Sequence, residues 1–216
     1  MEMRNQKGEV LAILNIDSPQ EENTIDIVIR QLKPGMGKGI YLAADKKISQ
    51  QTNYGAVKWT GGIEELKAKT SSWEAVFPAD AEVMDIQVYY GFDNLTQEEI
   101  DEMAIESSRT GKDVVRDLIP NDTLVGVSLL YRKEETEFEF RIFGTTKSRI
   151  HVPDLEKHTI ENLTIRSNEA VYIRNNELQR LIWAEVGSTK GKALQYEVVA
   201  EHSDRDSLIS ISESLS

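Results

Sequence analysis

The sequence predicts an α+β fold, with antiparallel, hairpin-rich sheets and a few short helices, one of them at the C-terminus. Two observations lead to this prediction. Runs of alternating hydrophobic and polar residues recur in pairs separated by short turn sequences, which is the pattern of β-hairpins. The helical patterns are short and do not alternate regularly with the strands, so a parallel sheet with crossover helices is not expected.

The last third of the chain, residues 159–215, is predicted to fold as a module of strands with a closing helix. Asn175 and Asn176 supply a turn, because Asn tolerates the left-handed conformation that a two-residue hairpin loop requires. Ser203 with Asp206 three residues later predicts a capped helix, which must pack on the strands because a short helix is unstable alone. The expected strand cores are 170–173, 181–184 and 195–200, and the helix is expected to bury Leu208, Ile211 and Leu215.

The remainder is divided at residue 72. Residues 1–72 form a β-rich region, with a small separate domain as one interpretation, and residues 73–216 form an α+β domain. The alternation of Ile25, Ile27 and Ile29 with polar residues predicts a strand. The strands expected in the first region cover residues 9–16, 24–32, 40–44 and 56–59, and a weak helix covers 63–69.

The clearest helix signal lies in the middle of the chain. Thr96 and Glu99 form a capping box, and the helix that follows to about residue 107 is expected to bury Ile100, Met103 and Ala104. Residues 114–119 are expected to continue helically. Strands are expected over residues 82–90, 124–131 and 137–143, followed by a linker over 144–153.

Composition excludes several classes of function. The net charge is −12, and the 25 basic residues are dispersed among 37 acidic ones, so nucleic acid and anionic membrane surfaces are not expected partners. The chain contains no cysteine, which excludes disulfides, thiolate nucleophiles and Cys-ligated zinc. No apolar run approaches the about 18 residues that a membrane span needs.

The motifs that suggest chemistry each have a simpler explanation. The run from Gly35 to Gly39 lacks the spacing of a phosphate loop and precedes a strand, so a flexible hairpin connection is the better interpretation. His151 and His158, with Asp154 and Glu156, have no zinc-like spacing and are interpreted as solvated linker residues. His202 is interpreted as part of the turn before the closing helix.

Two further groups are also explained without a binding site. The acidic stretch 97–102 lacks the alternating oxygen ligands of a calcium loop and is explained by the positive end of the helix dipole. Trp59, Trp73 and Trp183 are interpreted as core anchors. We therefore predict no catalytic, cofactor-binding or metal-binding residues, and a protein that is not an enzyme.

The closing module resembles the bacterial domain of unknown function family 4367, which is common in Gram-positive spore formers. The resemblance is carried by residues 168–172, 175–176, 181–185, 196–198 and 206–215, and it extends less closely back to Trp73. Ser210 and Ser212 stand where the family carries bulkier or alanine-like helix residues. Such domains usually lie outside the membrane behind one transmembrane helix, sometimes in anti-sigma or sporulation-related proteins.

The resemblance implies a non-enzymatic, extracytoplasmic binding or sensing module of a membrane-tethered protein, whose partner is an unknown protein or small-molecule ligand. It implies contact with a membrane only through an anchor ahead of Met1, and the sequence alone leaves a cytoplasmic location open. The first alternative is a lipid- or lipoprotein-binding carrier with an apolar cavity, because the Val- and Ile-rich hairpins allow one. A cytosolic hydrolase or metal enzyme is the second alternative, because catalytic groups can meet in space without being close in sequence.

Overall fold

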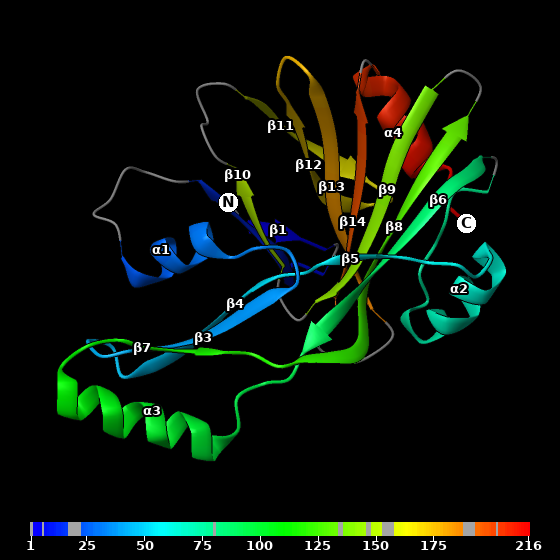
Figure 1. The fold of residues 1–216 in the computed structure, drawn as a ribbon. Coiled ribbons are helices and arrows are strands. Elements are labelled where there is room, and N and C mark those ends of the chain that lie inside the picture. The colour runs from blue at the N-terminus through cyan, green and yellow to red at the C-terminus, as the bar shows by residue number, and fades with distance from the viewer. Residues whose placement is uncertain are drawn as a thin grey trace. The chain divides into compact units, whose positions relative to one another are not determined.

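The computed structural model of the 216-residue chain describes residues 2–5, 7–16, 23–79, 81–133, 136–145, 148–152, 158–187, 193–201 and 203–216. Within these residues the strands form three sheets (Figure 1). The antiparallel, hairpin-rich α+β fold predicted from the sequence is confirmed, including the helix at the C-terminus. The helices are α1 (Thr24–Gln31), α2 (Ile63–Lys69), α3 (Gln97–Thr110) and α4 (Arg205–Glu213), with a 3-10 turn η1 (Ser71–Trp73).

The largest sheet has eight strands in the order β11-β12-β13-β14-β9-β8-β6-β5. These strands are β11 (Thr159–Ile165), β12 (Asn168–Arg174), β13 (Leu178–Val186), β14 (Ala193–Glu201), β9 (Thr136–Thr145), β8 (Pro120–Lys133), β6 (Glu82–Phe92) and β5 (Ala56–Lys58). From β11 to β8 each strand is antiparallel to its neighbour.

Two smaller sheets have three strands each. One consists of β1 (Glu2–Arg4), β2 (Val10–Ile16) and β10 (Ser148–Val152), and β10 runs parallel to β2. The other has β3 (Met36–Leu42) between β4 (Lys47–Asn53) and β7 (Val114–Asp117), both antiparallel to it.

The chain folds into two compact units that are not continuous in sequence. The larger unit comprises residues 1–18, 58–88 and 126–216, and the smaller comprises 19–57 and 89–125. This division differs from the boundary expected at residue 72, which falls inside the larger unit. The difference arises because the chain leaves the larger unit at residue 19 and again at residue 89, and returns to it both times. A single boundary in the sequence cannot describe units that are each made of separate segments.

One face of the eight-stranded sheet forms the main core of the larger unit. Trp183 on β13 is fully buried and stacks on Tyr196 of β14, with ring centroids 5.2 Å apart and an interplanar angle of 11°. Phe140 of β9 lies against Tyr196 at 6.0 Å and against Phe77 at 6.4 Å. Helix α4 contacts β11, β13 and β14, and the burial predicted for Leu208, Ile211 and Leu215 is confirmed.

The opposite face of this sheet carries a second apolar cluster. Met3 of β1 is buried there against Val171 and Ile173 of β12, Ile182 and Ala184 of β13, and Ala193 of β14. Residues that pair across neighbouring strands share a face, and Val171 pairs with Ile182. The N-terminal strand therefore covers the end of the sheet formed by β12 and β13.

In the smaller unit, helix α1 contacts β4, and helix α3 contacts β3 and β7. The Thr96–Glu99 capping box predicted for α3 is confirmed, with the Glu99 amide donating to the Thr96 hydroxyl at 3.2 Å. A Cβ at Gly37 or Gly39 of β3 would meet Phe92, Leu95 or Leu118, so these glycines let the side chains pack on the strand.

Four sequence predictions about local structure were wrong. Residues 24–31 form α1, because Asn23 and Asp26 make a capping box and Val28 becomes the buried residue of the helix. Val114 to Asp117 forms β7, because it pairs with β3. The expected linker over 144–153 contains β10, whose partner β2 lies far away in sequence. The cap of α4 is Asp204 in place of Ser203, since its carboxylate accepts from the Ser207 amide at 2.8 Å.

Candidate functional site

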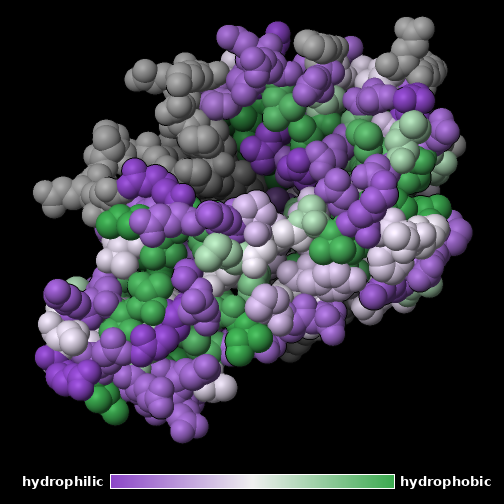
Figure 2. All heavy atoms as spheres, in the orientation of Figure 1, coloured by the Kyte–Doolittle hydropathy of each residue, from purple (hydrophilic) through white to green (hydrophobic). Residues whose placement is uncertain are grey.

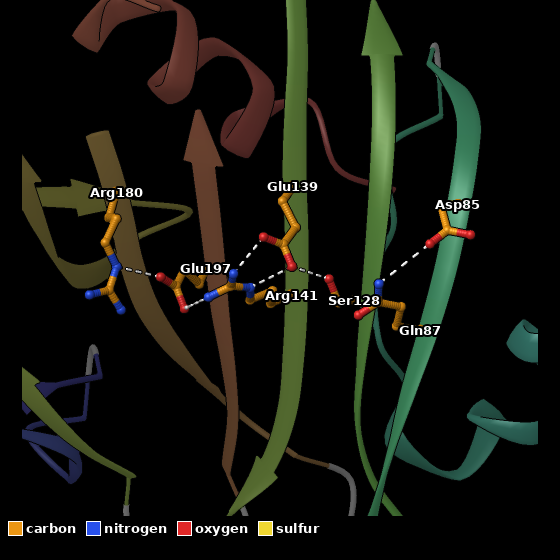
Figure 3. Close-up of polar contacts among 7 residues, drawn as sticks. All are labelled: Asp85, Gln87, Ser128, Glu139, Arg141, Arg180 and Glu197. Atoms are coloured by element: carbon orange, nitrogen blue, oxygen red, sulfur yellow. Dashed lines mark hydrogen bonds and ion pairs between the residues drawn. The ribbon is translucent and has the colours of Figure 1, made fainter. Parts of the chain in front are cut away.

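A row of charged side chains crosses the middle of the eight-stranded sheet (Figure 3). Arg180 of β13 donates through Nε to Glu197 of β14 at 2.5 Å, and Arg141 Nη1 of β9 lies 3.6 Å from the other Glu197 oxygen. Arg141 also donates through Nε to Glu139 at 2.7 Å, and the Ser128 hydroxyl of β8 donates to the same Glu139 oxygen. Each carboxylate in the row therefore has a cation within reach.

The row is best explained as a structural network. Glu197 is only 3 % exposed, and burying a carboxylate is unfavourable unless charged partners are buried with it. Burial alone would raise the pKa of Glu139, but hydrogen bonds from Arg141 and Ser128 outweigh burial and lower it. Because the two arginines and two glutamates satisfy one another, the row leaves no charge for a ligand.

A polar pocket of about 810 Å³ lies at one corner of the same sheet. The start of β11, the hairpin between β12 and β13, and the N-terminal end of α4 supply its walls. The lining side chains are charged, amide or hydroxyl groups: Thr159, Glu161, Tyr172, Arg174, Asn175, Asn176, Gln179, Ser203, Asp204, Arg205 and Asp206.

A short hydrogen-bond chain fixes one wall of the pocket. The buried Tyr172 hydroxyl donates to the Gln179 Oε1 atom at 2.5 Å, and Gln179 Nε2 donates to the Ser203 carbonyl. Burial raises the pKa of Tyr172, so the phenol stays protonated and remains a donor. Gln179 therefore ties β13 to the chain segment just before α4.

A bidentate ion pair and a helix cap fix the adjoining part of the pocket wall, where Glu161 pairs with Tyr172 across β11 and β12. Arg205 of α4 donates to both oxygens of Glu161 on β11, at 2.9 and 2.6 Å. This hydrogen bonding lowers the pKa of Glu161, and hydrogen bonds from Ser207 lower the pKa of Asp204. Both carboxylates are therefore held ionised by the fold.

Arg174 differs from the other charged residues of the pocket in its lack of a side-chain hydrogen-bond or ion-pair partner among the described residues. It ends β12, its side chain is exposed, and no carboxylate among the described residues pairs with it. Beside it, the side-chain oxygen of Asn175 accepts the amides of Glu177 and Leu178 at 2.9 and 2.7 Å, which holds the hairpin in place. The pocket thus presents one guanidinium whose hydrogen-bonding capacity is open to a ligand.

The pocket was not predicted from the sequence. Asn175 and Asn176 were assigned a turn role only, and the turn is confirmed by the hairpin. The left-handed conformation expected there is wrong, because neither residue has a positive φ and the Asn175 side chain holds the turn by accepting backbone amides. Asp206 was predicted to form a capping box with Ser203, and the structure pairs it with Arg205 at 3.0 Å. No local motif signals the site, since residues 159–161, 172–179 and 203–206 meet only in the folded sheet.

The residues considered earlier as metal ligands do not form a described site. Asp154, Glu156 and His202 lie outside the described residues, as does the side chain of His151, and His158 is half-buried. Within the described residues, no group of three or more His, Asp or Glu side chains could hold a metal ion.

The glycine and tryptophan interpretations need correction in part. Gly37 and Gly39 lie inside β3 and not in a hairpin connection, because their missing side chains make room for packing. Only Trp183 is a fully buried core anchor, since Trp59 and Trp73 are half-buried. The indole of Trp59 instead lies under the Lys69 ammonium at 5.3 Å.

None of the protein-family models, curated proteins or solved structures with which the chain was compared matches it. No helix within the described ranges is both long enough and apolar enough to cross a bilayer. In the view of Figure 2, hydrophilic side chains predominate on the visible face. The pocket at the corner of the sheet is therefore the feature that suggests a function.

Proposed function

We propose that the chain is a non-enzymatic binding and sensing module whose corner pocket holds the anionic group of a polar ligand or partner protein. In this proposal it is an extracytoplasmic domain of a membrane-tethered bacterial protein, active in anti-sigma or sporulation signalling, as the family resemblance implies. The observation that carries the binding role is Arg174, an exposed guanidinium without a carboxylate partner in the described structure, at the rim of a polar pocket.

The charges of the pocket restrict the ligand. The lining has the two guanidinium groups of Arg174 and Arg205 and three carboxylates. Arg205 is already paired with Glu161 and Asp206, so Arg174 is the cation whose hydrogen bonds remain for a ligand anion. A guanidinium pairs with a carboxylate through two parallel hydrogen bonds. Because the chain carries a net charge of −12, a polyanion would be repelled. A molecule or peptide segment with a single carboxylate and further polar groups fits best.

The electrostatics of the pocket favour binding over proton transfer. A general acid at neutral pH needs a carboxyl group whose pKa is raised toward 7. The pKa of Glu161 and of Asp204 is lowered instead, by hydrogen bonds that hold both groups in place. These carboxylates therefore have a structural role in the wall of the pocket.

The lipid-carrier alternative requires an apolar cavity, and the pocket described here is lined by charged and amide groups. An acyl chain in this pocket would remove water from Arg174 and Asp206 without replacing their hydrogen bonds, which is unfavourable. The geometry of the corner pocket therefore supports a polar ligand.

The proposal is tested with two probes that differ only in charge: N-acetyl-dialanine with a free C-terminal carboxylate, and the same peptide as its C-terminal amide. Binding is followed by chemical-shift changes of backbone amides. We expect the carboxylate probe to perturb the amides of Arg174, Asn175 and Asn176, and the amide probe to have little effect. Arg174→Gln should weaken carboxylate binding by at least about tenfold, because a charge-assisted pair contributes about 1.5–3 kcal/mol.

Arg109 supplies the matched control. It is an exposed guanidinium on α3, outside the pocket, so Arg109→Gln removes the same charge and should leave binding unchanged. Equal binding of both probes, or equal weakening by both substitutions, would show that Arg174 is not a ligand site. Binding of a fatty acid micelle in preference to the carboxylate peptide would favour the lipid-carrier alternative.

A further inference from the structure

Within the described residues, strand β11 forms an open edge of the eight-stranded sheet. It is the first strand in the sheet order, and β12 is its one neighbour there. All seven of its residues pair with β12 in one continuous register, from Thr159 opposite Arg174 to Ile165 opposite Asn168. An edge of this length without a bulge is a regular template for another strand.

The geometry of the β11–β12 hairpin shows which backbone groups point outward. The two-residue turn at Arg166 and Ser167 has φ values of 47° and 64°, so Ile165 and Asn168 form the hydrogen-bonded pair next to it. Hydrogen-bonded and open pairs then alternate along the strands. The N–H and C=O groups of Ile160, Asn162 and Thr164 therefore face away from β12, and none of them has another partner in the described structure.

Two other sheet edges, β5 and β7, carry features that discourage pairing, and β4, an edge as long as β11, begins with a lysine. Strand β5 is three residues long and ends in Lys58, and β7 has four residues and includes Arg116 and Asp117. Strand β11 contains neither Lys nor Pro, and its one charged side chain, Glu161, is held by Arg205. Because lysine, proline and short length usually protect an edge, a seven-residue strand without lysine or proline, whose single charge is already paired, is marked as a pairing surface.

We propose that β11 pairs with β11 of a second copy of this chain, antiparallel, around a two-fold axis at Asn162. In this register Ile160 of each copy lies opposite Thr164 of the other, and Asn162 lies opposite its own counterpart. All three outward-facing residues then exchange their backbone hydrogen bonds, and the two sheets continue into one. This inference does not depend on the pocket or on its ligand.

The side chains of β11 fit a second copy of the same strand. A residue on a two-fold axis must be complementary to itself, and the Asn162 amide is, because it carries both a donor and an acceptor. Ile160 opposite Thr164 is a pair of β-branched residues, which suits a sheet. Glu161 would lie opposite Leu163 of the other copy, so no two like charges face each other directly, and the Glu161–Arg205 pair brings no unpaired charge to the axis.

The absence of cysteine from the chain makes a direct test available. Asn162→Cys places two thiols across the axis, where the Cα atoms of a hydrogen-bonded pair lie about 5.5 Å apart, within the range that a disulfide spans. Thr164→Cys is the matched control, because its counterpart lies about four residues, or about 13 Å, further along the strand. Mild oxidation should cross-link Asn162→Cys and leave Thr164→Cys monomeric, whereas a mixture of Ile160→Cys and Thr164→Cys should cross-link.

Light scattering of the unaltered chain provides the second measurement. We expect a mass that approaches twice the 24.5 kDa of one chain as concentration rises, and an Asn162→Lys variant that stays monomeric with unchanged circular dichroism. Added salt should strengthen the dimer, because it screens the repulsion between two chains of net charge −12. A monomeric mass at every concentration and salt level, or equal cross-linking of all three cysteine variants alone, would overturn the proposal.

Discussion

Replacing Trp183 by Ala tests whether the face of the sheet beneath α4 holds the larger unit together. The Trp183 side chain is fully buried and stacks on Tyr196 with ring centroids 5.2 Å apart. Its indole Nε1 donates to Glu185 at 3.0 Å, but the same Glu185 oxygen also accepts from Arg166 at 2.9 Å. The substitution therefore removes apolar contacts and leaves no carboxylate without a partner.

The magnitude follows from the buried surface. A buried Trp side chain removes about 150–250 Å² from water, which at about 25 cal/mol per Å² corresponds to about 4–6 kcal/mol as an upper bound. Ala retains a part of this burial, but the stacking on Tyr196, worth about 0.5–1.5 kcal/mol, is lost, and a cavity remains. We expect the free energy of unfolding to fall by about 3–5 kcal/mol.

The measurement is urea unfolding followed by far-ultraviolet circular dichroism. Tryptophan fluorescence is unsuitable, because the substitution itself removes a tryptophan and changes the signal whatever happens to stability. A lower midpoint with an unchanged slope reports the loss of stability. Trp59→Ala is the control, since Trp59 is half-buried and its contact with the Lys69 ammonium contributes about 1 kcal/mol at most. Equal midpoints for the native chain and Trp183→Ala would refute the assignment of Trp183 as a core anchor.

Two further predictions concern the charged row and the β11–β12 turn. The folded-state pKa of Glu139 is lowered from 4.5, so its ionised form stabilises the fold above about pH 4.5 and this contribution is lost as the pH falls through the folded value. The difference in unfolding free energy between the native chain and Glu139→Gln should therefore shrink between neutral pH and about pH 3, and a constant difference would contradict the role given to Arg141. Ser167 has a φ of 64°, so Ser167→Gly should raise the free energy of unfolding by about 1 kcal/mol while Ser167→Ala brings no gain, which thermal melting can check.

The sequence was sufficient where local signals and packing agree. The Thr96–Glu99 capping box, the Asn175–Asn176 turn and the buried face of α4 were all predicted from a few neighbouring residues. The strand predicted over residues 24–32 was wrong. Three isoleucines at every second position fit a strand, but the capping box at Asn23 favours a helix. The helix predicted over residues 114–119 was wrong, because the conformation of residues 114–117 is decided by pairing with β3, which lies far away in the sequence.

The corner pocket could not be predicted for the same physical reason. Glu161, Arg174 and Arg205 each have an unremarkable local setting, and only the sheet brings them to one place. The serines of α4 illustrate the limit on a smaller scale. Ser212 is fully buried, yet its hydroxyl donates to the Leu208 carbonyl of the same helix at 2.9 Å, so a residue that weakens the helix in isolation is satisfied in the fold.

The parallel pairing of β2 with β10 has a consequence for how the protein is made. Ala12 pairs with Ser148, so β2 cannot form this pairing until a further 136 residues have been synthesised. At about 5–20 residues per second that delay is about 7–27 s. The burial of Met3 is complete only later, because its apolar cluster includes Ala193. During synthesis the first hairpin is therefore marginally stable on its own and keeps hydrophobic side chains exposed until its partners have been made.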